Sequence, residues 1–256
     1  MKLPTIPDLL TTANLVCGVG SILLASQGQL TIACGLIFLA AVFDVFDGLA
    51  ARALGGGTPL GAQLDSLADM VSFGVAPGII VWHMSYQEAL LVLYSDPLAD
   101  HFGIQVGTNP IVLVGWLTAI IIVVGSAWRL AKFNIDTRQS HGFLGLPTPA
   151  NALFWASVGI GRMQGDRVVA SMANPYVIAL IALALAVLML SELPLPSLKI
   201  KHKGWKGNEV IFLLIGIGAV LVLLYGILAV PLILIIYLLS PLWGRIFHRN
   251  AETQSR

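Results

Sequence analysis

The chain has 256 residues, of which 57% are hydrophobic and 11% are charged, and its formal net charge is +1. Soluble globular proteins carry about 25% charged residues, so this composition excludes that class and predicts a polytopic membrane protein. No nucleic-acid partner is expected.

Eight apolar segments approach the roughly 20 residues that a membrane-spanning helix needs. The fifth is short, and Gly226 and Pro231 divide the last apolar run into a hairpin. Cys17 and Cys34 fall within these segments, where they are expected to be packing residues and not a disulfide. We therefore expect an all-α polytopic helical bundle of about eight transmembrane helices, over residues 9–27, 29–53, 60–83, 109–131, 149–163, 174–192, 209–226 and 228–244.

Lysine and arginine residues divide unevenly between the two sides of such a bundle. With the N-terminus inside, only Arg162 and Arg167 lie outside, and the longest outside loop, about 84–108, contains neither residue type. The positive-inside rule then places both termini in the cytoplasm, and we expect the chain to lie in the cell (inner) membrane. The basic stretch LKIKHKGWKGNE supports this orientation and is also compatible with recognition of anionic lipids. The inside residues are Lys2, Arg52, Arg129, Lys132, Arg138, Lys199, Lys201, Lys203, Lys206, Arg245, Arg249 and Arg256.

Four carboxylates interrupt the second and third apolar segments. Asp44 and Asp47 are three residues apart, and Asp65 and Asp69 are four apart, so each pair lies on one helical face. The two helices run in opposite directions across the short turn ALGGGTPL. A rise of about 1.5 Å per residue sets Asp47 opposite Asp65 and Asp44 opposite Asp69. We therefore expect all four to converge in the cytoplasmic third of the membrane.

Four carboxylates do not stay ionised together in apolar surroundings without cations. Oxygen-only ligands suit Mg²⁺ or Mn²⁺, and no cysteine or histidine lies near them in the sequence. Two divalent cations fit four carboxylates better than one, and they leave positions for a phosphate-bearing substrate. Two alternatives remain open: four protonated or individually paired acids, and a transporter whose acids carry cations or protons.

The four aspartates share a fixed pattern with small residues and one arginine: Asp44-x-x-Asp47-Gly48-x-x-Ala51-Arg52, eight further residues, then Gly61-x-x-x-Asp65-x-x-x-Asp69. This pattern resembles the signature of the CDP-alcohol phosphatidyltransferases, and every fixed position is present. The resemblance implies transfer of a phosphatidyl group from a CDP-linked lipid to an alcohol, with release of CMP.

The resemblance also implies roles for individual residues. Asp44, Asp47 and Asp65 would hold two divalent cations, Mn²⁺ or Mg²⁺, and Asp69 would both contact metal and act as general base. The small residues of the pattern are equally suited to close helix packing. The CDP moiety would be bound by Thr11, Asn14, Gly48, Ala51, Arg52 and Gly61.

Three further stretches resemble the phosphatidylserine synthase branch of this family: SFGVAP (72–77), RLAKFN (129–134) and GLPTPA (145–150). They imply CDP-diacylglycerol as donor and L-serine as acceptor, while glycerol 3-phosphate and inositol phosphate remain alternatives. The candidates for binding serine or lipid phosphate are Ser72, Arg129, Lys132 and Asn134, for which charge anchoring and helix kinking are the other interpretations.

The resembling segments span about residues 7–151. We expect a catalytic core over 1–192, built on a six-helix family core, and a second region over 193–256 with a basic cytoplasmic loop, a C-terminal helix pair and a short cytoplasmic tail. Membrane lipids would surround both regions. A homodimer is expected from the resemblance alone.

Overall fold

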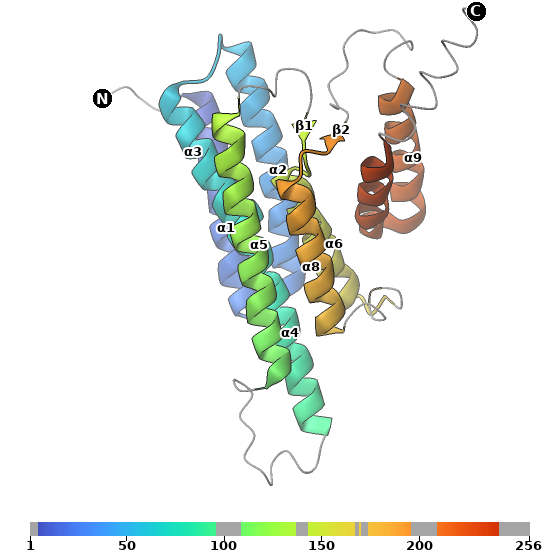
Figure 1. Ribbon diagram of the computed structural model, residues 1–256. Coiled ribbons are helices and arrows are strands. Elements are labelled where there is room, and N and C mark those ends of the chain that lie inside the picture. Colours follow the sequence, from blue (N-terminus) through green and yellow to red (C-terminus); the bar gives the residue numbers. More distant parts are fainter. Residues whose placement is uncertain are drawn as a thin grey trace, which may run out of the picture.

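The computed structural model describes residues 5–95, 109–136, 143–166, 169, 174–195 and 209–240. Its helices run alternately up and down in one bundle (Figure 1), which confirms the predicted all-α class. The elements are α1 (Ile6–Ser26), α2 (Leu30–Ala53), α3 (Pro59–Asp69), the π-helix η1 (Met70–Val75), α4 (Ala76–Ser95), α5 (Pro110–Ile135), β1 (Phe143–Leu144), α6 (Thr148–Met163), α8 (Pro175–Leu190), β2 (Pro194–Leu195), α9 (Glu209–Tyr225), the 3₁₀ turn η4 (Gly226–Leu228) and a last helix over residues 229–240.

Five helical stretches among the described residues are long and apolar enough to cross a membrane. They are Ile6–Ser26, Leu30–Ala53, Pro59–Leu93, Pro110–Ile135 and Ile211–Ser240, and α8 is a shorter apolar helix. Large apolar side chains cover the outer surface, among them Trp128 and Leu180. In water such a surface would be unfavourable, and in a bilayer it faces lipid. The chain is therefore a multi-pass helical membrane protein.

The eight expected helices correspond to eight helical segments in the described part of the chain. The turn η4 divides Ile211–Ser240 into two antiparallel halves, as the predicted hairpin requires. We call α9, η4 and residues 229–240 the C-terminal hairpin. Cys17 and Cys34 are both buried and free, which confirms that they form no disulfide.

One predicted boundary is wrong. The outside loop was expected from about residue 84, but α4 continues to Ser95. Residues 84–93 are mainly apolar or helix-favouring, and Glu88 pairs with Arg162 at the end of α6, so the last turns of α4 have a packing partner. The rest of that loop, 96–108, lies outside the described residues.

Three helices begin with the same local signal, a capping side chain followed directly by proline. Asn109 accepts a hydrogen bond from the Ile111 amide (2.8 Å), and Asn174 accepts one from the Tyr176 amide (2.9 Å). Thr58 accepts one from the Gly61 amide (2.9 Å) at the start of α3. Such caps satisfy amides that have no partner within the helix, and proline suits the first helical position. The cap at Thr58 fixes where the helix carrying Asp65 and Asp69 begins.

The start of α1, the α2–α3 turn, the end of α5 and the end of the last helix all lie at one end of the bundle (Figure 1). Arg52, Arg129 and Lys132 lie toward this end and Arg162 toward the other. The remaining basic residues behind the orientation prediction lie outside the described residues, so the cytoplasmic orientation stays a prediction.

Candidate active site

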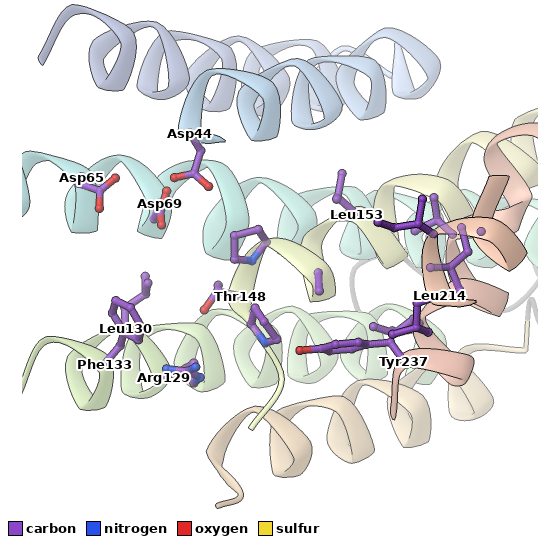
Figure 2. A pocket seen from close by; sticks show the side chains of 18 residues that line it. Asp44, Asp65, Asp69, Arg129, Leu130, Phe133, Thr148, Leu153, Leu214 and Tyr237 are labelled. Atoms are coloured by element: carbon purple, nitrogen blue, oxygen red, sulfur yellow. The ribbon is translucent and has the colours of Figure 1, made fainter. Parts of the chain in front are cut away.

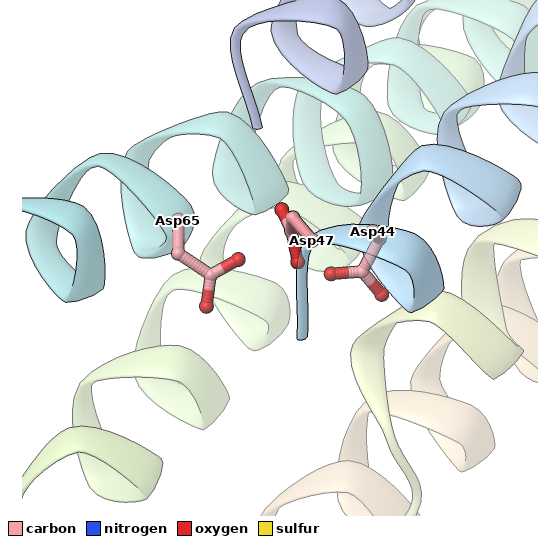
Figure 3. Close-up of side chains that lie close together, drawn as sticks. All are labelled: Asp44, Asp47 and Asp65. Carbon is pink, nitrogen blue, oxygen red and sulfur yellow. The ribbon is translucent and has the colours of Figure 1, made fainter. Parts of the chain in front are cut away.

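The four aspartates converge where α2 ends and α3 returns. Carboxylate oxygens of Asp44, Asp47 and Asp65 all lie within 4.8 Å of one another (Figure 3). Asp69 lies one turn beyond Asp65, where its carboxyl group is within hydrogen-bonding reach of Asp44. This arrangement matches the convergence expected from the helical spacing.

Helix α1 orients two of these carboxylates from the side. Thr11 Oγ1 donates a hydrogen bond to Asp47 Oδ2 (2.7 Å), and Asn14 Nδ2 donates one to Asp69 Oδ1 (3.1 Å). All four side chains are buried. Because Thr11 and Asn14 are three residues apart, they lie on one face of α1. Both residues therefore contact the carboxylates directly from the same face of α1.

The π-helix η1 begins directly after Asp69. The Ala76 amide bonds to the Val71 carbonyl, five residues back, and Pro77 contributes no amide at all. Ser72 Oγ donates to the Asn14 carbonyl (2.9 Å), so η1 is fastened to α1. A Cβ on Gly18 would lie 2.3 Å from Ser72 Oγ, which shows how closely the two backbones approach. Asp69 is thus held by rigid packing on both sides.

The stretch GLPTPA forms a turn over the end of α8. Gly145 has φ +73°, and a Cβ there would lie 2.6 Å from the Ser191 carbonyl oxygen, so no other residue fits without a shift. The Leu146 carbonyl accepts a hydrogen bond from Arg129 Nε (3.3 Å). Arg129 is 5% exposed and lies 5.4 Å over the Phe133 ring. The turn therefore fixes a buried guanidinium beside the start of α6.

A large cavity of about 720 Å³ opens beside Asp44, Asp65 and Asp69 (Figure 2). Arg129 lies on the opposite wall from the carboxylates, Thr148 lies between the two walls, and the C-terminal hairpin lines the other end. The remaining lining residues are Leu130, Phe133, Pro147, Pro149, Ala150, Leu153, Leu214, Ile215, Gly218, Val230, Ile233, Leu234 and Tyr237. The wall is mainly apolar.

A smaller cavity of about 420 Å³ lies on the other side of the carboxylates. Asp47 and Asp65 border it, and the Arg52 guanidinium lies over Gly48, 3.5 Å from where a Cβ would stand. Asp8 lies against Gly61 and also accepts hydrogen bonds from Thr5 at the start of α1. The other lining residues are Pro7, Thr11, Ala51, Leu54, Gly56, Gly57, Thr58 and Ala62. This wall is rich in hydroxyl groups and exposed backbone.

The predicted CDP-binding residues therefore gather around the smaller cavity, with one exception. Thr11, Gly48, Ala51 and Gly61 line it, and Arg52 lies at Gly48, whereas Asn14 lies deeper, against Asp69. Sequence reasoning placed the glycine turn near the site, favouring flexibility over a phosphate-binding role, and did not predict that Thr58, Gly56 and Gly57 line this cavity. The residues GGGTP predict a turn, but they do not predict that this turn and Asp65 line the same cavity.

The predicted serine-site residues do not share one place. Arg129 lines the large cavity, on the opposite wall from the carboxylates (Figure 2). Lys132 donates a hydrogen bond to the Leu190 carbonyl (3.1 Å), and Asn134 exchanges hydrogen bonds with Ser66. Ser72 is buried against α1. Of these four, Arg129 is positioned to contact a ligand in the large cavity.

The donor set fits divalent cations. Three carboxylate oxygens from separate side chains lie close enough to share an ion, and Asp65 Oδ1 is buried without a hydrogen-bond partner among the described residues. A buried carboxylate oxygen is costly unless something compensates it. Mg²⁺ and Mn²⁺ prefer such oxygen ligands.

Comparisons with known proteins agree with this geometry. The family model described as CDP-alcohol phosphatidyltransferase matches residues 4–240. A Methanocaldococcus jannaschii CDP-diacylglycerol--serine O-phosphatidyltransferase is 32% identical over 197 residues, covering 77% of this chain and 76% of that protein. A Bacillus subtilis protein of the same name is 29% identical over 197 residues, covering 77% and 92%. The archaetidylserine synthase of Methanothermobacter thermautotrophicus is 33% identical over 193 residues, covering 75% and 69%.

Proposed function

The chain belongs to the CDP-alcohol phosphatidyltransferase family, and we propose that it transfers the phosphatidyl group of CDP-diacylglycerol to the hydroxyl of L-serine, forming phosphatidylserine and releasing CMP. The observation that carries this proposal is the position of the carboxylates between a polar cavity and an apolar one. A CDP-linked lipid has the same order: a nucleotide, a diphosphate and hydrocarbon. The names of the three relatives agree on serine and differ in the lipid, which supports serine as acceptor.

The smaller cavity suits the nucleotide. Its threonine hydroxyl groups and exposed backbone offer hydrogen bonds, and its small residues, Gly48, Ala51 and Gly61, leave room for a flat base and a ribose. Arg52 would pair with a phosphate at its mouth, since guanidinium groups bind phosphate oxygens in pairs.

Asp44, Asp47, Asp65 and Asp69 are the residues that would hold two divalent cations, Mn²⁺ or Mg²⁺. Bound there, such ions would polarise the diphosphate and stabilise the negative charge of the departing CMP. Thr11 and Asn14 act on the same carboxylates from outside, because each fixes the orientation of one of them.

Asp69 is the proposed general base. It would take the proton of the serine hydroxyl while the serine oxygen bonds to the phosphatidyl phosphorus and the bond from that phosphorus to the CMP oxygen breaks. Its position supports this role, because it borders the large cavity and is held by Asn14 on one side and η1 on the other.

Arg129 is the proposed partner of the serine carboxylate. Its Nε donates to the Leu146 carbonyl and its side chain lines the cavity, so the terminal nitrogens of the guanidinium are the groups that would bind the carboxylate. Lys132, Asn134 and Ser72 would act indirectly by fixing α5 and η1 against their neighbours.

We further infer a cytoplasmic active site in the cell membrane, from the unequal distribution of basic residues, and a homodimer, from family resemblance. The core would comprise residues 1–192 and the extension 193–256. A cation-coupled transporter remains the rival of a different class, and it predicts ion uptake into vesicles without CMP release.

The test is CMP release and lipid labelling by the purified protein with CDP-diacylglycerol, Mn²⁺ or Mg²⁺, and labelled L-serine. Parallel reactions contain glycerol 3-phosphate or inositol phosphate. Label in lipid with serine alone is expected. Activity with another alcohol would overturn the serine assignment, and no CMP release with any acceptor would overturn the proposed reaction.

A further inference from the structure

The large cavity begins at the carboxylates and ends against the C-terminal hairpin (Figure 2). We propose that the hairpin is part of the active site: it forms the far wall of a subsite for a hydrocarbon chain of the CDP-linked lipid, and Gly218 sets how long a chain the subsite takes. This inference rests on the proposed function, because that function supplies a substrate with a phosphate and a hydrocarbon end.

The composition of the wall points to hydrocarbon. Twelve of the eighteen lining residues are apolar, and the three aspartates and Arg129 lie at the end away from the hairpin (Figure 2). A zwitterionic acceptor would gain little from the apolar end, because Tyr237 is the one described hairpin residue lining the cavity with a polar group to compensate its desolvation. A ligand whose diphosphate reaches Asp44, Asp65 and Asp69 would have its apolar part pointing toward the hairpin.

The hairpin contributes seven of the eighteen lining residues, so it forms a large part of the cavity wall. It is held against the core at several points. Leu234 belongs to the main buried cluster, and Leu214 and Tyr237 are buried together with Leu195 of β2. The Leu228 side chain packs against Gly161 of α6, where an added Cβ would lie only 2.5 Å from Leu228 Cδ2. These contacts fix the width of the space between hairpin and core.

Gly218 is the feature that keeps the far end open. It lines the cavity between larger aliphatic residues, and a Cβ there would meet only Ile233, at 3.7 Å from Cδ1. A leucine at 218 would therefore be tolerated by the fold and would extend into the cavity. Gly216, two residues earlier on α9, has nothing within 4 Å of its Cβ position and is exposed. It offers the matched control.

The experiment compares Gly218→Leu with Gly216→Leu, using CDP-diacylglycerol with chains of about 16 carbons or about 8 carbons, and measures kcat/KM from CMP release. Each buried methylene is worth about a fourfold change in binding, so filling the far end should lower kcat/KM for the long-chain lipid about tenfold or more. The short-chain lipid should be affected little, and Gly216→Leu should leave the ratio of the two lipids unchanged. An equal loss with both lipids, or the same ratio in both variants, would overturn the proposal.

A second measurement needs neither a variant nor an acceptor. CDP-diacylglycerol carrying a diazirine at the end of one chain is photolysed with the full-length wild-type protein, and labelled peptides are mapped by mass spectrometry. Label on α9 and residues 229–240 supports the subsite, and label confined to other helices contradicts it. Because this readout is binding, it separates failure of the subsite from failure of the serine reaction.

Discussion

The two ends of the large cavity are built in opposite ways. At the carboxylate end, backbones approach so closely that a Cβ on Gly18 would lie 2.3 Å from Ser72 Oγ, and hydrogen bonds fix Asp47 and Asp69. At the hairpin end, a Cβ on Gly218 would meet only Ile233, at 3.7 Å from Cδ1. In an 18-residue apolar stretch of Ile211–Ser240, 11% of the residues are buried, against 33% in the corresponding stretch of α1. Small residues thus allow close backbone packing around the carboxylates, and at the hairpin they leave space in the cavity.

The difference indicates that the two ends have different functions: one positions catalytic groups and the other accommodates a hydrocarbon chain. Chemistry at phosphorus needs carboxylates held within a fraction of an ångström, which requires rigid support on several sides. A hydrocarbon chain is flexible and has no directional contacts, so its wall only has to be apolar and correctly spaced. Substitutions at the carboxylate end should therefore affect every substrate equally, and those at the hairpin end should change selectivity.

The largest expected effect is at Asp69. Asp69→Asn removes the proposed base while keeping shape and volume, and general-base catalysis contributes about a hundred- to ten-thousandfold to rate. CMP release should fall by that factor with long-chain and short-chain lipids alike. Glu192→Gln serves as control, because this acid lies outside the carboxylate cluster. A loss confined to one chain length would contradict the division between the two ends.

A smaller effect is expected at Thr11. Thr11→Val keeps the shape and removes the hydrogen bond to Asp47, so Asp47 loses the group that orients it. Loss of such an outer contact typically weakens metal binding about 10- to 100-fold. The Mn²⁺ or Mg²⁺ concentration giving half-maximal CMP release should rise accordingly.

Thr12→Val is the matched control for that experiment. Thr12 is exposed and donates only to the Asp8 carbonyl within its own helix (2.7 Å). It should leave the metal requirement unchanged. If both variants raise that requirement equally, the effect comes from α1 as a helix and not from the contact with Asp47.

In the GLPTPA turn, which packs over the end of α8, a substitution at Gly145 should lower the stability of the fold. Gly145→Ala combines a positive φ with a Cβ 2.6 Å from the Ser191 carbonyl oxygen. Gly165→Ala has a similar φ, +69°, but open space. Strain from φ alone costs about 1–2 kcal/mol, so Gly165→Ala should lower the thermal midpoint in detergent modestly and Gly145→Ala clearly more. Equal shifts would show that the turn can move away from α8.

Much of the fold follows from the sequence because membrane helices are long apolar runs, and their ends carry caps and prolines. The limits are instructive. The extension of α4 to Ser95 depends on the partner of Glu88 on α6, which lies 74 residues away. The π-helix η1 depends on close packing against α1, and propensities carry no signal for it. The pairing of β1 with β2 involves two residues on each side, too few to show a period.

The site divides in the same way. The carboxylates could be predicted because three- and four-residue spacings place side chains on one face, whatever surrounds them. The stretch RLAKFN did not indicate which of its polar side chains would reach the active-site cavity. Packing sends Arg129 into the cavity, Lys132 to α8 and Asn134 to α3. The hairpin's share of the cavity was also missed, since a helix that is apolar all round does not reveal which face meets the core.

We expect the smallest effect at Tyr237. This residue tests where the carboxylate end of the large cavity stops and the hairpin end begins. Its side chain belongs to the hairpin but lies in the cavity, close enough to Arg129 for an electrostatic interaction (Figure 2). Tyr237→Phe keeps the ring and removes the hydroxyl. The hydroxyl is expected to help hold Arg129, the proposed partner of the serine carboxylate, and a single such polar contact is worth about 1 kcal/mol. The KM for serine should therefore rise about fivefold, while the ratio of kcat/KM between long-chain and short-chain lipid stays constant. Tyr225→Phe, at the exposed far end of α9, should change neither quantity. A changed lipid ratio with an unchanged KM for serine would instead assign Tyr237 to the hydrocarbon wall and move the boundary toward Arg129.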